Sequence, residues 1–90
     1  MSKVIKIKAD KMSELVKFGY EQADYNENYI IKYIPDSEVD MPKNYYRTLY
    51  VNKETRELFA YHEYYDERIE MQDEWINDLI TAGLTEVVDE

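Results

Sequence analysis

The fold is decided by residues 44–65, NYYRTLYVNKETRELFAYHEYY, where two segments rich in β-forming residues, 45–51 and 58–64, flank a polar turn. Pairing Asn52 with Glu57 across this turn separates the side chains into two faces. The aliphatic face contains Leu49, Val51, Leu58 and Ala60, and the ring face contains Tyr46, Tyr50, Phe59 and Tyr61. We predict that the aliphatic face packs into the core and that the ring face forms a row of aromatic side chains. A register slip of one residue would exchange the two faces.

The segment before the hairpin predicts a strand, a short helix and a second strand. Residues 3–8 alternate lysine with aliphatic residues, which is typical of a strand with one solvated face, and Ile5 and Ile7 are expected to point inward. Residues 11–18 predict a helix capped by Asp10 and ended by Gly19. Its apolar stripe is expected to contain Met12, Leu15, Val16 and Phe18. A loop over 21–28 then leads to a strand over 29–34.

The segment after the hairpin is acidic and predicts a second helix. DERIEMQDEWINDLI, residues 66–80, contains apolar residues at helical spacing, so we expect a helix that starts between Asp66 and Asp73 and ends at Ala82, before Gly83. Its buried stripe is expected to contain Ile69, Gln72 or Trp75, Ile76, Leu79 and Ile80. In the alternative, residues 68–71 extend the sheet and the helix starts only at Asp73. Residues 84–88 predict a last short strand.

These elements predict an α+β fold, in which two helices pack on one face of a small, mostly antiparallel sheet in the order β-α-β-β-β-α-β. The length of 90 residues allows one compact domain over residues 1–90, with no linker.

The composition excludes several classes of partner and chemistry. The net charge is −9, and residues 54–90 hold twelve of the twenty acids but only two of the eleven bases. This balance disfavours direct contact with nucleic acid or anionic lipid and favours a basic protein. The chain has no cysteine, which excludes disulfides and thiolate sites. The start MSKVIKIKAD contains no apolar signal core, so we expect neither export nor membrane insertion, and a cytoplasmic location.

No motif predicts catalysis or a cofactor. The only histidine, His62, lacks the second histidine that a zinc helix requires four residues later, and we interpret it as a strand residue opposite Arg47 or near Glu63. Asp36, Glu38 and Asp40 alternate as in a calcium loop, but Met41 stands where that loop needs glycine. The carboxylates after the hairpin are numerous, yet catalysis needs two in different environments within a cleft. We therefore expect a protein that is not an enzyme and has no cofactor or metal.

The surface carries the functional prediction. Ten tyrosines exceed what so small a core can bury with every hydroxyl bonded, so several should be exposed. Exposed tyrosines are typical of binding hot spots, and carboxylates steer a basic partner. The expected partner-binding residues are Tyr46, Tyr61, Glu63, Tyr64, Tyr65, Asp66, Glu67, Glu70, Asp73, Glu74 and Asp78. We predict an inhibitor that occupies the basic, nucleic-acid-binding site of a target, with these acids in the place of phosphates. The alternatives are an assembly module or homodimer formed through the aromatic hairpin, and a sheet in which the tyrosines only fill space and the acids only solubilise.

The two ends of the chain also resemble a class of proteins. VIKIKADKMSELVKFGY, residues 4–20, and WINDLITAGLTEVVDE, residues 75–90, are similar to small lysine- and glutamate-rich proteins of phages and prophages of Gram-positive bacteria. Small acidic proteins of this class include inhibitors of host defence, such as anti-CRISPR proteins and DNA mimics. The resemblance implies an inhibitor of that type and assigns no functional residue.

Overall fold

The hairpin predicted from residues 44–65 is the centre of the sheet in the computed structural model, which describes residues 3–34 and 47–89. Its strands are β4 (Arg47–Asn52) and β5 (Glu57–His62), and the predicted register is confirmed, with Val51 opposite Leu58 and Leu49 opposite Ala60. The left-handed backbone of Arg56, at φ +68°, helps to close the turn between them. Leu49, Val51, Leu58 and Ala60 are all buried, so the aliphatic face is the core face as predicted.

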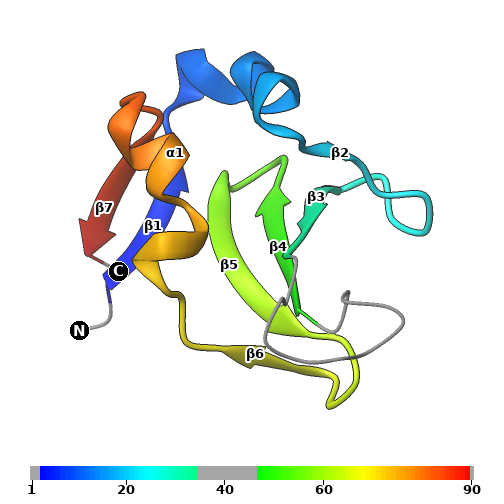
Figure 1. Ribbon diagram of the computed structural model, residues 1–90. Coiled ribbons are helices and arrows are strands. Elements are labelled where there is room, and N and C mark those ends of the chain that lie inside the picture. Colours follow the sequence, from blue (N-terminus) through cyan, green and yellow to red (C-terminus); the bar gives the residue numbers. More distant parts are fainter. Residues whose placement is uncertain (1–2, 35–46, 90) are drawn as a thin grey trace.

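Five further strands complete a sheet of seven strands within the described residues, and all pairings are antiparallel. They are β1 (Lys3–Ile7), β2 (Glu21–Gln22), β3 (Tyr29–Tyr33), β6 (Glu67–Ile69) and β7 (Thr85–Asp89). The sheet runs in the order β2-β3-β4-β5-β1-β7. The outer edge of β5 is shared, because Leu58 pairs with Ile5 of β1 and Ala60 pairs with Ile69 of β6. Figure 1 shows β5 as a long bent strand that reaches both neighbours.

The helical content is small, which places the fold between α+β and mainly β. The helical segments are η1 (Ala9–Phe18), a 3-10 helix, the single turn η2 (Asp73–Trp75) and α1 (Asn77–Thr81). Leu15 of η1 and Leu79 of α1 belong to the same buried cluster as the aliphatic face of the hairpin. They lie in that cluster with Ile7, Tyr20, Ile34, Ile76 and Leu84.

The first helix differs from the prediction in type and in its exposed residue. Its N-cap residue is Lys8, whose side chain makes no capping hydrogen bond. Asp10 lies in the first turn instead of at the N-cap. Residues three apart align in a 3-10 helix, so Met12, Leu15 and Phe18 face the core while Val16 is 71% exposed. The predicted end is confirmed, because Gly19 adopts φ +92° and Tyr20 folds back into the core.

The second helix was predicted too long. Glu67, Arg68 and Ile69 form strand β6, which overlaps the alternative prediction of a strand over 68–71. Helical structure begins only at Asp73, as that alternative predicted. The physical reason is the open outer edge of β5, where Tyr61 pairs with Arg68 and the backbone bonds of residues 67–69 are satisfied between strands. Strands β6 and β2 are both additional to the predicted order. Ile80, expected in the buried stripe, is 42% exposed.

Candidate functional site

The ring face of the hairpin is hollowed into a groove of about 380 Å³. Five aromatic rings, two carboxylates and one guanidinium line it. We call it the tyrosine groove and define it by Tyr25, Tyr29, Tyr50, Phe59, Tyr61, Glu63, Asp66 and Arg68. Its volume lies at the low end of the range of about 300–1,000 Å³ that is usual for ligand pockets. The groove is therefore large enough for one side chain or head group.

Sheet register places the rings of the groove beside one another. Tyr50 and Phe59 are cross-strand neighbours, and their rings stack with centroids 5.4 Å apart at an interplanar angle of 18°. Tyr29, from β3, meets the edge of this stack, with its centroid 5.3 Å from that of Tyr50. Tyr61 lies on the other side of Tyr50 at 5.5 Å. The rings contact each other in the offset and edge-on arrangements that aromatic pairs prefer, so they form a rigid wall.

A chain of hydrogen bonds connects the rings to a carboxylate. The Tyr50 hydroxyl donates to Glu63 Oε1 at 2.6 Å, and the hydroxyl oxygens of Tyr25 and Tyr50 lie 2.5 Å apart. Tyr50 is only 8% exposed, whereas Tyr25 is 62% exposed. The chain therefore leads from a buried ring to a tyrosine at the surface.

A second tyrosine and carboxylate pair closes the other side of the groove. The Tyr61 hydroxyl donates to Asp66 Oδ1. Asp66 has a left-handed backbone, with φ +56°, in the tight turn between β5 and β6. Aspartate tolerates this conformation better than most residues, and the turn aims its side chain back at the groove.

Among the described residues, one cation lines the groove, and it is already engaged. The Arg68 guanidinium lies over the Phe59 ring, with Cζ 3.9 Å from the ring centroid, and forms an ion pair with Glu57 at 3.1 Å. Register explains this position, because Arg68 of β6 is opposite Tyr61 on the ring face.

The tyrosine hydroxyls of the site keep their protons to high pH. The hydrogen bond to Asp66, with smaller contributions from burial and from carboxylates nearby, raises the pKa of Tyr61 from its ordinary 10.0 to about 12. Burial, followed by the bonds to Glu63 and Tyr25, raises the pKa of Tyr50 still further. Burial, followed by Tyr25 and three carboxylates, also raises the pKa of Tyr33. The neutral phenol is thus the form in which each carboxylate of the groove is bonded.

These raised pKa values predict that the protein loses stability in alkali. Because the folded pKa lies above the unfolded one, the stabilisation by Tyr61 is complete below pH 10 and is lost between pH 10 and about 12. Ultraviolet titration of tyrosinate should show a class of tyrosines that ionise well above pH 10. Replacing Asp66 by asparagine should move Tyr61 out of that class by lowering its pKa. A single titration of all tyrosines near pH 10 in the folded protein would contradict this assignment.

Two of the predicted anchor tyrosines lie in the turn that follows β5. Tyr64 and Tyr65 are 70% and 66% exposed, and their rings meet edge to face at 5.1 Å. The Tyr65 ring also contacts His62, at 4.5 Å between centroids, and its backbone N–H donates to His62 Nδ1. His62 is opposite Arg47 and Glu67 in the sheet, so its prediction as a strand residue is confirmed.

The structure brings only some of the predicted binding residues together. Tyr61, Glu63 and Asp66 line the groove, and Tyr64, Tyr65 and Glu67 lie in or beside the adjoining turn. The other acids, expected on one helix, are distributed over separate elements: Glu70 follows β6, Asp73 and Glu74 lie in η2, and Asp78 lies in α1. Asp78 forms an ion pair with Lys32 at 3.6 Å. Tyr46 and the calcium-like residues Asp36, Glu38 and Asp40 lie outside the described residues.

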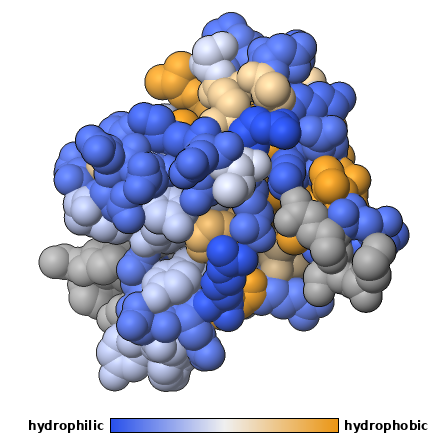
Figure 2. Space-filling view, turned by 180° about the vertical axis from the view of Figure 1, so that it is seen from behind, coloured by the Kyte–Doolittle hydropathy of each residue, from blue (hydrophilic) through white to orange (hydrophobic). Residues whose placement is uncertain are grey.

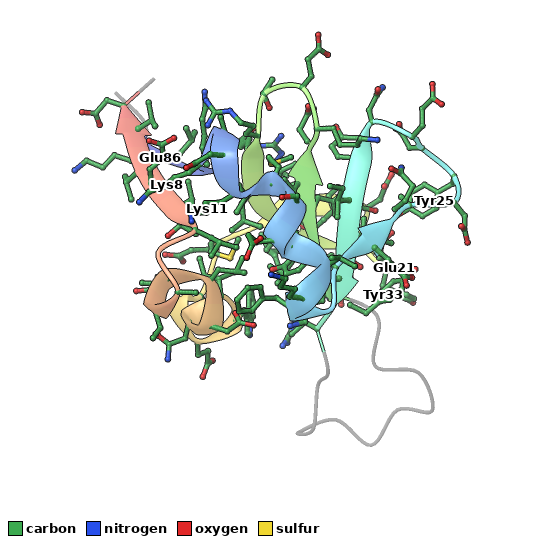
Figure 3. All side chains as sticks on the ribbon, turned by 90° about the horizontal axis from the view of Figure 1, so that it is seen from above. Lys8, Lys11, Glu21, Tyr25, Tyr33 and Glu86 are labelled. Carbon is green, nitrogen blue, oxygen red and sulfur yellow. The ribbon has the colours of Figure 1, made fainter. Side chains whose placement is uncertain are left out.

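Tyr25, Tyr29 and Arg68 belong to the groove but are not among the binding residues predicted from the sequence. Tyr29 and Arg68 reach the groove through strand pairing, and Tyr25 reaches it from a loop that contains no periodic pattern. The ring face also extends beyond the groove to Glu21 and Tyr33, which line a neighbouring hollow. Figure 3 shows these two residues and Tyr25 on the same side of the molecule, opposite Lys8, Lys11 and Glu86. The period-two spacing of Tyr29, Ile31 and Tyr33 was the available signal.

The described residues contain neither a metal-binding cluster nor a membrane-spanning helix. In residues 3–34 and 47–89, no group of three or more histidine, aspartate or glutamate side chains is placed to hold a metal ion. Within the same ranges no helix combines the length and apolar character needed to cross a membrane. From the side opposite to Figure 1 the surface is mainly hydrophilic, with hydrophobic residues in separate patches (Figure 2). No protein-family model, curated protein or solved structure matches this chain.

Proposed function

We propose that this protein is a non-enzymatic inhibitor that docks on a basic surface of a target protein through the tyrosine groove and the adjoining turn with Tyr64 and Tyr65. The observation that supports this most directly is the combination, on one side of the sheet, of rings with bonded carboxylates. Glu63 and Asp66 are each held by a tyrosine hydroxyl, so little entropy remains to be lost when a cation binds.

Exposure and charge support the choice of partner. Tyr64 and Tyr65 offer large contact areas and few rotatable bonds, which favours them as anchors of an interface. Glu67, opposite His62 in the sheet, is exposed next to this turn, and Glu70 is exposed just after β6. The net charge of −9 attracts a basic surface over the Debye length of about 8–10 Å. The resemblance of the chain ends to phage proteins supports a nucleic-acid enzyme of a bacterial host as the target, with the carboxylates in the place of phosphates and with the protein in the cytoplasm of that host.

The test is capture of targets by immobilised protein from a bacterial extract treated with nuclease. We expect a basic protein that is retained at low salt, eluted by high salt and displaced by duplex DNA. The double reversal Glu67→Lys and Glu70→Lys should reduce its retention by about tenfold or more, because it places repulsive charges against the target.

A matched control keeps the net charge of this variant but moves the reversals. Asp10 and Glu54 are exposed in η1 and in the turn between β4 and β5, at the opposite end of the hairpin from Tyr64 and Tyr65. The variant Asp10→Lys with Glu54→Lys should retain the target nearly as wild type does. Equal losses in the two variants would mean that only net charge matters and would refute a defined docking face. Retention unaffected by DNA would refute mimicry of nucleic acid while leaving a protein target.

Self-association is the competing outcome of the same experiment. If the protein recovers only itself and light scattering gives a dimer that dissociates when Tyr64 and Tyr65 are replaced by serine, the exposed rings serve assembly instead of inhibition. These two tyrosines are better probes than Tyr50, because Tyr50 is buried and its replacement disturbs the fold.

A further inference from the structure

Arg68 shows how one guanidinium is held beside the tyrosine groove. Its guanidinium lies over Phe59 with Cζ 3.9 Å from the ring centroid, well within the distance of about 6 Å that defines a cation–π contact. A carboxylate, Glu57, completes this arrangement at 3.1 Å. One ring face and one carboxylate thus already hold one guanidinium at the rim of the groove.

The rest of the groove repeats the same two components. Tyr61 and Tyr25 contribute rings that are partly or largely exposed, and Glu63 and Asp66 contribute carboxylates. Among the described residues, the tyrosine bonds use Oε1 of Glu63 and Oδ1 of Asp66, which leaves Oε2 and Oδ2 to accept further hydrogen bonds. Of the described lining residues, two are carboxylates and one is a cation, so together they carry an excess of negative charge.

We propose that the tyrosine groove binds one arginine side chain of the partner, next to Arg68. This inference deepens the proposed function and rests on it. The entering guanidinium stacks on the exposed rings and donates to Glu63 and Asp66. Arginine fits better than lysine because its planar, weakly hydrated guanidinium stacks on rings and offers several N–H donors in one plane, whereas an ammonium group is compact and strongly hydrated.

The test is an NMR titration of the whole protein with N-acetyl-arginine methylamide. We expect millimolar affinity, as is usual for one exposed side chain, with the shifts concentrated on the ring protons of Tyr25, Tyr50 and Tyr61. The citrulline analogue, which has nearly the same shape without the charge, should bind at least about fivefold more weakly, and the lysine analogue should also bind more weakly. Equal binding of arginine and citrulline, or shifts outside the groove, would overturn the proposal.

Two variants test the two components separately. Glu63→Gln keeps an acceptor for the Tyr50 hydroxyl but removes the charge, and Tyr61→Leu removes a partly exposed ring. Each should weaken arginine binding about fivefold or more, while Glu54→Gln, at the far turn, should leave it unchanged. Amide spectra of each variant show whether the fold is intact. Unchanged affinity in folded Glu63→Gln or Tyr61→Leu would contradict a site in the groove.

The two proposals can fail independently. If a basic target is retained and released by the reversals at Glu67 and Glu70 but arginine does not bind in the groove, docking is correct and the arginine site is wrong. If arginine binds in the groove but no basic target is retained, the groove is a cation site and the inhibitory function is wrong.

Discussion

Replacing Leu79 by alanine is expected to lower the free energy of unfolding by about 2–5 kcal/mol. Leu79 is fully buried in α1, a helix of only five residues, and a helix this short has no stability of its own in water. The segment is therefore held by Leu79 and Ile76, which pack on the aliphatic face of the hairpin. Urea denaturation followed by Trp75 fluorescence measures the change as a shift of the midpoint at constant slope.

The adjacent residue supplies the control for this prediction. Ile80→Ala lies in the same helix and removes a side chain of the same size, but Ile80 is 42% exposed. Its cost should stay below about 1 kcal/mol. Equal losses at the two positions would mean that α1 does not pack as described.

Replacing Tyr50 by alanine should cost about 3–5 kcal/mol, since it removes a buried ring that contacts Tyr29, Phe59 and Tyr61. The same change removes the hydrogen bond to Glu63. Thermal and urea denaturation at neutral pH measure the sum of both effects.

Tyr50→Phe separates the ring from its hydroxyl. It keeps the stack with Phe59 and leaves Glu63 without its bonded proton, so its cost should be about 1.5–3 kcal/mol, the range for a hydrogen bond to a charged group. The phenylalanine variant should therefore retain much of the stability lost in the alanine variant. If both variants are equally unstable, the hydroxyl chain and not the ring stack holds this face of the sheet together.

The hairpin could be predicted from the sequence because its two faces differ in chemistry. Leu49, Val51, Leu58 and Ala60 alternate with rings and polar residues, and a shift of one residue would exchange the aliphatic face with the ring face. The local pattern and the tertiary pairing therefore require the same register.

The acidic segment could not be predicted in the same way because its structure depends on a neighbour. Residues 66–70 belong to an acidic segment whose apolar residues have helical spacing. However, the open edge of β5 pairs with residues 67–69 as a strand, and Asp66 turns the chain with a left-handed backbone. The groove residues likewise divide into those that the local pattern predicts and those that depend on tertiary contacts. Tyr61 and Glu63 were predicted from the hairpin, whereas Tyr25 and Arg68 depend on contacts between elements that the chain spacing alone does not specify.

The place of β1 between β5 and β7 has a consequence for synthesis on the ribosome. Lys3 pairs with Asp89, and Ile5 pairs with both Leu58 and Val87, so β1 is made before both of its neighbours and has neither until residues far along the chain emerge. At about 5–20 residues per second this interval lasts on the order of ten seconds. During it, the lysines that alternate with Val4, Ile5 and Ile7 keep an unpaired strand charged and so disfavour its association with other nascent chains. The alternation that marks β1 as a strand thus also protects it before the sheet exists.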